Sequence, residues 1–166
     1  MASINIAGTV NDSIVDGEGF RFAIFVQGCP HHCEGCHNPQ THDFAGGYQT
    51  DTDSLYSQIK ANPLLSGVTF SGGEPFCQAG PLAELGRRIK ADGLDIWTYT
   101  GYTLEQLQKM HDEDIAALLD LTDVLIDGRF VLDERDLTLS FRGSRNQRLI
   151  DMNRTRQEGR IVEKVL

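Results

Sequence analysis

Three cysteines stand close together in the first quarter of the chain, with the spacing CxxxCxxC: Cys29, Cys33 and Cys36. This spacing lets one tight loop aim three thiolates at a common centre. A [4Fe-4S] cluster is usually held by four cysteine thiolates, so three would leave one of its irons open. An open metal position can take a substrate, as it does in catalytic zinc sites. The motif therefore indicates a cluster with a catalytic role rather than an electron relay alone.

Structural zinc is the main alternative for the same cysteines, because zinc takes four tetrahedral ligands. The sequence offers a fourth ligand in His31, His32, His37 or Cys77. A disulfide is disfavoured, since three clustered cysteines leave one over. The first residues also lack the basic start and apolar stretch of a secretory signal, so we expect a cytoplasmic protein with reduced thiols.

A second motif, SGGEP, begins at Ser71 and contains Gly72, Gly73 and Glu74. Two glycines allow the backbone to approach a ligand closely. Backbone carbonyls and the Glu74 carboxylate can accept hydrogen bonds from an ammonium group. The plainer interpretation of the motif by itself is a glycine turn before a helix.

Four stretches rich in β-branched and aromatic residues predict buried strands at 20–26, 68–70, 95–99 and 123–126. Apolar residues at helical spacing lie between them, and Thr103 with Gln106 resembles a capping box. Strands that alternate with helices favour an α/β fold, a parallel sheet with flanking helices. Ligands collect at the carboxyl ends of such strands.

Each predicted strand is followed at once by a polar or glycine-rich cluster, so all four clusters should lie at one rim of the sheet. The clusters are QGCPHHCEGCHN, SGGEP, TGY with Thr100, and DGRF with Asp127. Four such clusters in succession favour one shared site over four unrelated turns.

Length and composition favour a single soluble domain over residues 1–166. The chain has no repeat, linker or apolar run long enough to span a bilayer. Acidic residues outnumber basic ones by 24 to 15, which argues against a surface for nucleic acid. Residues 141–166 reverse this balance, with seven basic and three acidic residues. Two interpretations stay open for this segment: a solvated terminus, or a surface that contacts an acidic partner or an anionic ligand group.

CxxxCxxC followed by SGGEP resembles the signature of the radical S-adenosylmethionine (SAM) enzymes. The resemblance implies a shortened partial (β/α) barrel and a SAM molecule whose methionine end chelates the open iron. It also implies cleavage of SAM by the reduced cluster to a 5′-deoxyadenosyl radical. Cofactor contacts are then expected from residues of the two motifs: Gly35, Cys36, His37, Gly72, Gly73 and Glu74. Thr100 and Asp127, which end the third and fourth predicted strands, are further candidates for the ribose or the methionine end. Thr100 and Asp127 could equally be helix caps or turn formers.

Most of the chain also resembles one group of these oxidoreductases, the activating proteins of anaerobic ribonucleoside-triphosphate reductases. The resemblance rests on the cysteine stretch, SGGEP, WTYTGYTLEQL, VLIDGRF and FRGSRNQRLID. It implies that the reductase is the substrate, that one of its glycines becomes a glycyl radical, and that flavodoxin or ferredoxin donates the electron. The segment 141–148, FRGSRNQR, borders the site or receives the partner's glycine loop, or is a structural turn.

Two other radical SAM functions remain as alternatives at this point. One is activation of another glycyl radical enzyme, such as pyruvate formate lyase. The other is a small synthase of the 7-deazaguanine pathway.

Overall fold

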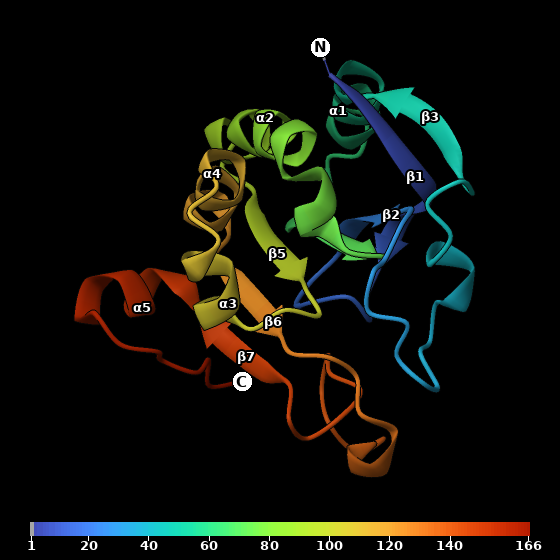
Figure 1. The fold of residues 1–166 in the computed structure, drawn as a ribbon. Helices are drawn as coiled ribbons and strands as arrows, with labels where there is room; N and C mark the ends of the chain where they lie inside the picture. The colour runs from blue at the N-terminus through green and yellow to red at the C-terminus, as the bar shows by residue number, and fades with distance from the viewer. Residues whose placement is uncertain (1) are drawn as a thin grey trace.

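The computed structural model describes residues 2–166, which form one seven-stranded mixed sheet with helices packed against it (Figure 1). The strand order is β3-β1-β2-β4-β5-β6-β7. The strands are β1 (Ser3–Ser13), β2 (Arg21–Val26), β3 (Tyr48–Asp51), β4 (Gly67–Gly72), β5 (Asp95–Tyr99), β6 (Val124–Asp127) and β7 (Arg148–Asp151). The α-helices are α1 (Thr52–Lys60), α2 (Ala79–Ala91), α3 (Leu104–Lys109), α4 (Glu113–Leu121) and α5 (Met152–Glu158). Three short 3-10 helices are η1 (Pro39–Thr41), η2 (Pro75–Gln78) and η3 (Leu132–Glu134).

The four predicted strands are confirmed as β2, β4, β5 and β6, which lie side by side and are all parallel. Their carboxyl ends therefore meet at one edge of the sheet, as the pattern of polar clusters predicted. The helices between them are confirmed as well. Thr103 caps α3 in a complete capping box with Gln106.

The prediction of a wholly parallel sheet was wrong at both edges. β1 runs antiparallel to β2, β3 antiparallel to β1, and β7 antiparallel to β6. These strands escaped prediction because their sequences lack a continuous apolar run: β3 is YQTD, and Gly8 interrupts β1. Tertiary pairing, rather than local propensity, makes them strands.

The helices all pack against the same face of the sheet. Side chains from α1 to α5 share one buried cluster with alternate residues of the strands, among them Ile24, Phe70 and Ile96. The opposite face holds a smaller cluster around Trp97 and Ile126, which the ring of Phe141 from the β6–β7 loop covers in part. Much of this second face is therefore free of helices.

The basic segment 141–166 is not a solvated terminus, because it contributes to the sheet and to the core. Leu149 and Ile150 of β7 are buried, and so are Met152 of α5 and Val162 beyond it. Most of its charged side chains are exposed, among them Arg145, Arg154 and Arg160. Within residues 2–166, no helix is both long and apolar enough to cross a membrane.

Candidate functional site

A cavity of about 840 Å³ opens on the helix-free face, at the carboxyl ends of the parallel strands. Phe25, Ser71 and Tyr99 form its floor from three neighbouring strands. The structure brings together here most of the site residues that the sequence predicted: Cys29, Cys33, Cys36, His37, Gly72, Gly73 and Thr100.

The cysteine loop leaves β2 and is tied back by hydrogen bonds to the last residue of η1 and the residue that follows it. The Gly28 N–H donates to the Thr41 carbonyl at 2.7 Å, and the Cys29 N–H donates to the His42 carbonyl at 3.1 Å. Gly28 has a φ of 103°, which favours glycine there. These contacts fix the first cysteine at the strand end, where the remaining loop can bend over the cavity.

All three cysteines of the motif are free thiols. Burial raises the pKa of Cys29, and the neighbouring Glu74 and Cys33 raise it further against opposing backbone hydrogen bonds. Burial also raises the pKa of Cys33, with a further contribution from Cys36. The Cys29 and Cys33 thiols are therefore protonated at neutral pH, and a metal centre must displace their protons to bind. All three cysteines line the same cavity.

The SGGEP segment packs directly under the cysteine loop. The Gly73 N–H donates to the Val26 carbonyl and the Glu74 N–H to the Gly28 carbonyl, both at 2.8 Å. A Cβ atom on Gly73 would lie 2.3 Å from the Gly28 carbonyl oxygen. Only glycine allows this approach, so the motif sets the position of the cysteine loop on the sheet.

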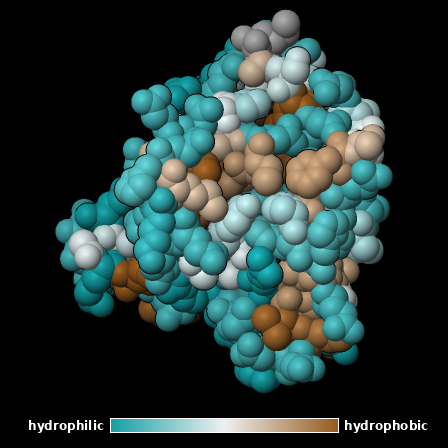
Figure 2. Space-filling model, in the orientation of Figure 1, coloured by the Kyte–Doolittle hydropathy of each residue, from teal (hydrophilic) through white to brown (hydrophobic). Residues whose placement is uncertain are grey.

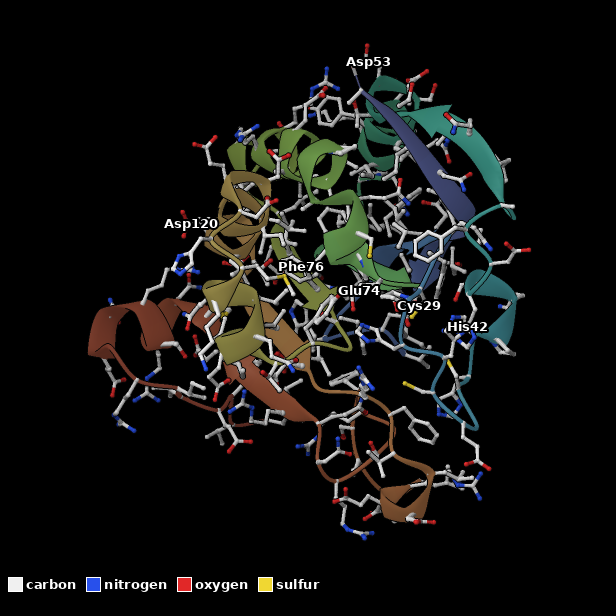
Figure 3. All side chains as sticks on the ribbon, viewed as in Figure 1. Cys29, His42, Asp53, Glu74, Phe76 and Asp120 are labelled. Atoms are coloured by element: carbon white, nitrogen blue, oxygen red, sulfur yellow. The ribbon has the colours of Figure 1, made fainter. Side chains whose placement is uncertain are left out.

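The Glu74 carboxylate is fully buried and connects three of the four strand-end clusters (Figure 3). His31 Nε2 lies 2.7 Å from Oε1, and the Gly101 N–H donates to the same oxygen at 2.8 Å. The Thr100 hydroxyl lies 2.9 Å from Oε2, which also accepts from the Phe76 N–H at 3.1 Å. Glu74 therefore joins the cysteine loop to the ends of β4 and β5, and its carboxylate is not in the cavity wall.

Asp127 and Gly35 were also predicted as cofactor contacts, and the structure places both outside the cavity wall. The Asp127 carboxylate is buried, accepts from the Leu104 N–H at 2.8 Å and pairs with Arg148, whose Nε lies 3.0 Å from Oδ1. This arrangement fits the helix-cap alternative. Gly35 has a φ of 75° and packs under Leu132, which a Cβ atom would approach to 2.9 Å.

Several cavity residues escaped the sequence analysis. His42 and Arg142 both line the cavity, and so do Ile14, Val15 and Asp16 of the β1–β2 loop. The β1–β2 residues could not be predicted because β1 itself was not. For Arg142, the one available signal was the basic FRGSRNQR segment, which left its role open.

The residues present fit an iron–sulfur cluster. Three free thiols border a single cavity wide enough for a cluster and an organic ligand, on a loop that neighbouring carbonyls hold in place. Cys77 lies outside the cavity wall, on η2. In residues 2–166, no group of three His, Cys, Asp or Glu side chains is arranged to hold a single metal ion.

Comparison with known families agrees with this geometry. Residues 15–150 match the model of the 4Fe-4S single cluster domain, so the protein is of the class that binds one such cluster. Among solved structures, QueE from Escherichia coli is similar over 61% of this chain and 54% of its own, with a TM-score of 0.47 and 18% identity.

Curated relatives named anaerobic ribonucleoside-triphosphate reductase-activating protein align with 81% of this chain. The protein from Vibrio cholerae is 38% identical over 142 residues and is covered to 89% of its length. That from Escherichia coli K12 is 39% identical over 144 residues, with 90% covered. That from Enterobacteria phage T4 is 33% identical over 143 residues, with 86% covered. The chain belongs to the family of anaerobic ribonucleoside-triphosphate reductase-activating proteins.

Proposed function

We propose that this protein is a radical SAM activase that generates a glycyl radical on an anaerobic ribonucleoside-triphosphate reductase. The observation that carries the proposal is the meeting of three free cysteines with the SGGEP glycines around one open cavity. Membership of the activating-protein family supports the choice of partner. Residues 1–166 would act as one domain, and the four parallel strands would form part of a (β/α) barrel.

Cys29, Cys33 and Cys36 would hold the cluster, each through its thiolate. A reduced [4Fe-4S] cluster with one open iron would supply the electron that cleaves SAM to methionine and a 5′-deoxyadenosyl radical. The chain's own residues would position the reactants. Gly72 and Gly73, which line the cavity, would present backbone groups to the ligand.

The remaining predicted contacts divide by their place in the structure. His37 and Thr100 are in the cavity wall, where they can touch the nucleoside or methionine part of SAM. Glu74, Asp127 and Gly35 would act through the loops that they hold. A direct contact between SAM and any of these three stays a prediction.

The mouth of the cavity favours a protein substrate. Ile14 and Val15 line the cavity and are 66% and 72% exposed. The β6–β7 loop, whose residues 139–143 line the cavity, also carries Leu137, which is 83% exposed, and this lobe shows apolar atoms in Figure 2. Exposed apolar side chains around an open site are typical of a surface that another macromolecule covers. A glycine loop of the reductase would enter here and give up a Cα hydrogen to the radical.

The test is an anaerobic assay of the reconstituted, reduced protein with SAM, with and without the reductase. We expect 5′-deoxyadenosine and, when the reductase is present, the electron paramagnetic resonance doublet of a glycyl radical. A reduced flavodoxin or ferredoxin should replace a chemical reductant. If SAM is cleaved but no radical forms on the reductase, the proposed partner is wrong. If the iron-loaded protein does not cleave SAM, the proposed chemistry is wrong.

A further inference from the structure

Two polar atoms in the cavity wall have no hydrogen-bond partner. Among the buried side-chain nitrogen and oxygen atoms of residues 2–166, only His42 Nε2 and Arg142 Nε lack one. Both side chains line the cavity that the cysteines border. A buried polar atom without a partner is unfavourable, so two of them at one cavity indicate that a ligand supplies the missing partners. Arg142 Nε can only donate, so its partner must be an acceptor.

The backbone before Arg142 is held in an unfavourable conformation. Phe141 has a φ of 64°, which is rare for a bulky residue. The Tyr99 hydroxyl donates to the Phe141 carbonyl at 2.8 Å, and the Phe141 ring meets Trp97 edge to face at a centroid distance of 5.2 Å. These contacts from β5 compensate for the backbone strain and fix the direction in which Arg142 leaves the loop.

The other side of Arg142 is fixed as well. Gln147 Oε1 accepts from the Gly143 N–H at 2.9 Å and from the Ser144 N–H at 3.1 Å. A Cβ atom on Gly143 would lie 3.2 Å from His37 Nε2, so this loop touches the residue that follows the last cysteine of the motif. Arg142 is therefore presented on a rigid loop beside the cysteine loop.

The charge of Arg142 is not neutralised within the described part of the chain. It is the only Lys or Arg in the cavity wall, and no ion pair between it and residues 2–166 is found. Its one hydrogen bond, from Nη1 to the Gln147 carbonyl, is long at 3.4 Å. Asp16, the one carboxylate in the wall, accepts a hydrogen bond from the Ser13 hydroxyl instead.

We propose that Arg142 binds the carboxylate of SAM and so orients the methionine end of the molecule in the cavity. The proposal rests on the function proposed above. A guanidinium presents a planar fork of donors that matches a carboxylate. The carboxylate is the only anionic group of SAM, whereas its ammonium and sulfonium groups would be repelled. A carboxylate of the partner protein offers the same chemistry, and the test separates the two sources.

The test measures dissociation constants on anaerobically reconstituted protein by equilibrium dialysis. The ligands are SAM and decarboxylated SAM, and the proteins are the wild type, Arg142→Gln, Arg142→Lys and Arg145→Gln. Arg145 is the matched control, because it lies on the same loop but is exposed and outside the cavity wall. Since Arg142 Nε has no partner, the substitution should leave the melting temperature of the metal-free protein unchanged.

We expect Arg142→Gln to weaken SAM binding about tenfold or more, the effect of a lost charge-assisted pair. The affinity of Arg142→Gln for decarboxylated SAM should fall by less than about twofold. Arg142→Lys should retain part of the affinity for SAM, and Arg145→Gln should bind SAM as tightly as the wild type does. If Arg142→Gln lost the same affinity for both ligands, or lost affinity for neither, the proposal would be overturned. Unchanged SAM affinity with weakened binding of the reductase would overturn it too, because the partner would then supply the carboxylate. A wild-type protein that carries iron but does not bind SAM would refute the proposed function itself.

Discussion

Replacement of Glu74 by glutamine tests whether this carboxylate joins the strand-end loops. In the wild type its two oxygens accept from four donors: His31, Thr100, Gly101 and Phe76. A glutamine has one acceptor oxygen and one NH₂ group. If the glutamine oxygen faces His31 and Gly101, its NH₂ group faces the Phe76 N–H. Two donors then point at each other, and neither has an acceptor.

The magnitude follows from these contacts. An unsatisfied buried donor costs about 1–3 kcal/mol, and each hydrogen bond to a neutral acceptor is about 1 kcal/mol weaker than one to a carboxylate. Removal of a buried charge offsets part of this loss. We therefore expect Glu74→Gln to lower the free energy of unfolding by about 3 kcal/mol, which is about 6–12 °C in melting temperature for a domain of this size.

The assay is thermal unfolding of the metal-free protein, followed by circular dichroism, because a bound cluster would add its own stabilisation. Glu34→Gln is the matched control: the same substitution at an exposed position of the cysteine loop. We expect the control to melt within about 2 °C of the wild type. If Glu74→Gln melts no lower than Glu34→Gln, the described role of Glu74 is wrong.

Two further substitutions test the frame around the site. In Gly73→Ala the new Cβ atom would lie 2.3 Å from the Gly28 carbonyl oxygen and should push this carbonyl away from the sheet. We therefore expect this variant to take up less iron. Gly8→Ala is the control, because nothing lies within 4 Å of its new atom, and it should take up as much iron as the wild type. Equal iron contents in the two variants would contradict this account. Although burial alone would raise the pKa of Asp123, its hydrogen bonds, first among them that from Lys90 at 2.7 Å, hold that pKa below the ordinary value of an aspartate. Asp123→Asn should therefore lower stability in urea by a constant amount at pH 5–8, and the difference from the wild type should shrink as the pH falls below about 3.8; a difference that grows in acid would refute the assignment.

The sequence allowed prediction of those parts of the fold that local patterns determine. The parallel strands carry runs of apolar residues, and the helices between them carry apolar residues at positions such as Leu82, Leu85 and Ile89. The edge strands could not be predicted, because β1, β3 and β7 depend on neighbours that only the folded chain provides. The same holds for the basic segment, whose composition concealed the buried Leu149 and Ile150.

The site shows the same division. The cysteine loop and SGGEP are short contiguous motifs, so their chemistry could be inferred from residue types and spacing alone. Whether a polar side chain faces the cavity depends on its partners in three dimensions. Glu74 is saturated by four donors, whereas Arg142 is left with an unpartnered nitrogen, and no spacing in the sequence distinguishes them.

The most direct test of the central claim is the iron and acid-labile sulfide content of anaerobically reconstituted protein. The samples are the wild type, the alanine variants of Cys29, Cys33 and Cys36, and Cys77→Ala as the matched control outside the cavity wall. We predict about four irons and four sulfides per chain in the wild type and in Cys77→Ala, and loss of most of both in the other three. A variant of the motif that keeps a full cluster, or a wild-type protein that takes up zinc in place of iron and sulfide, would contradict the account.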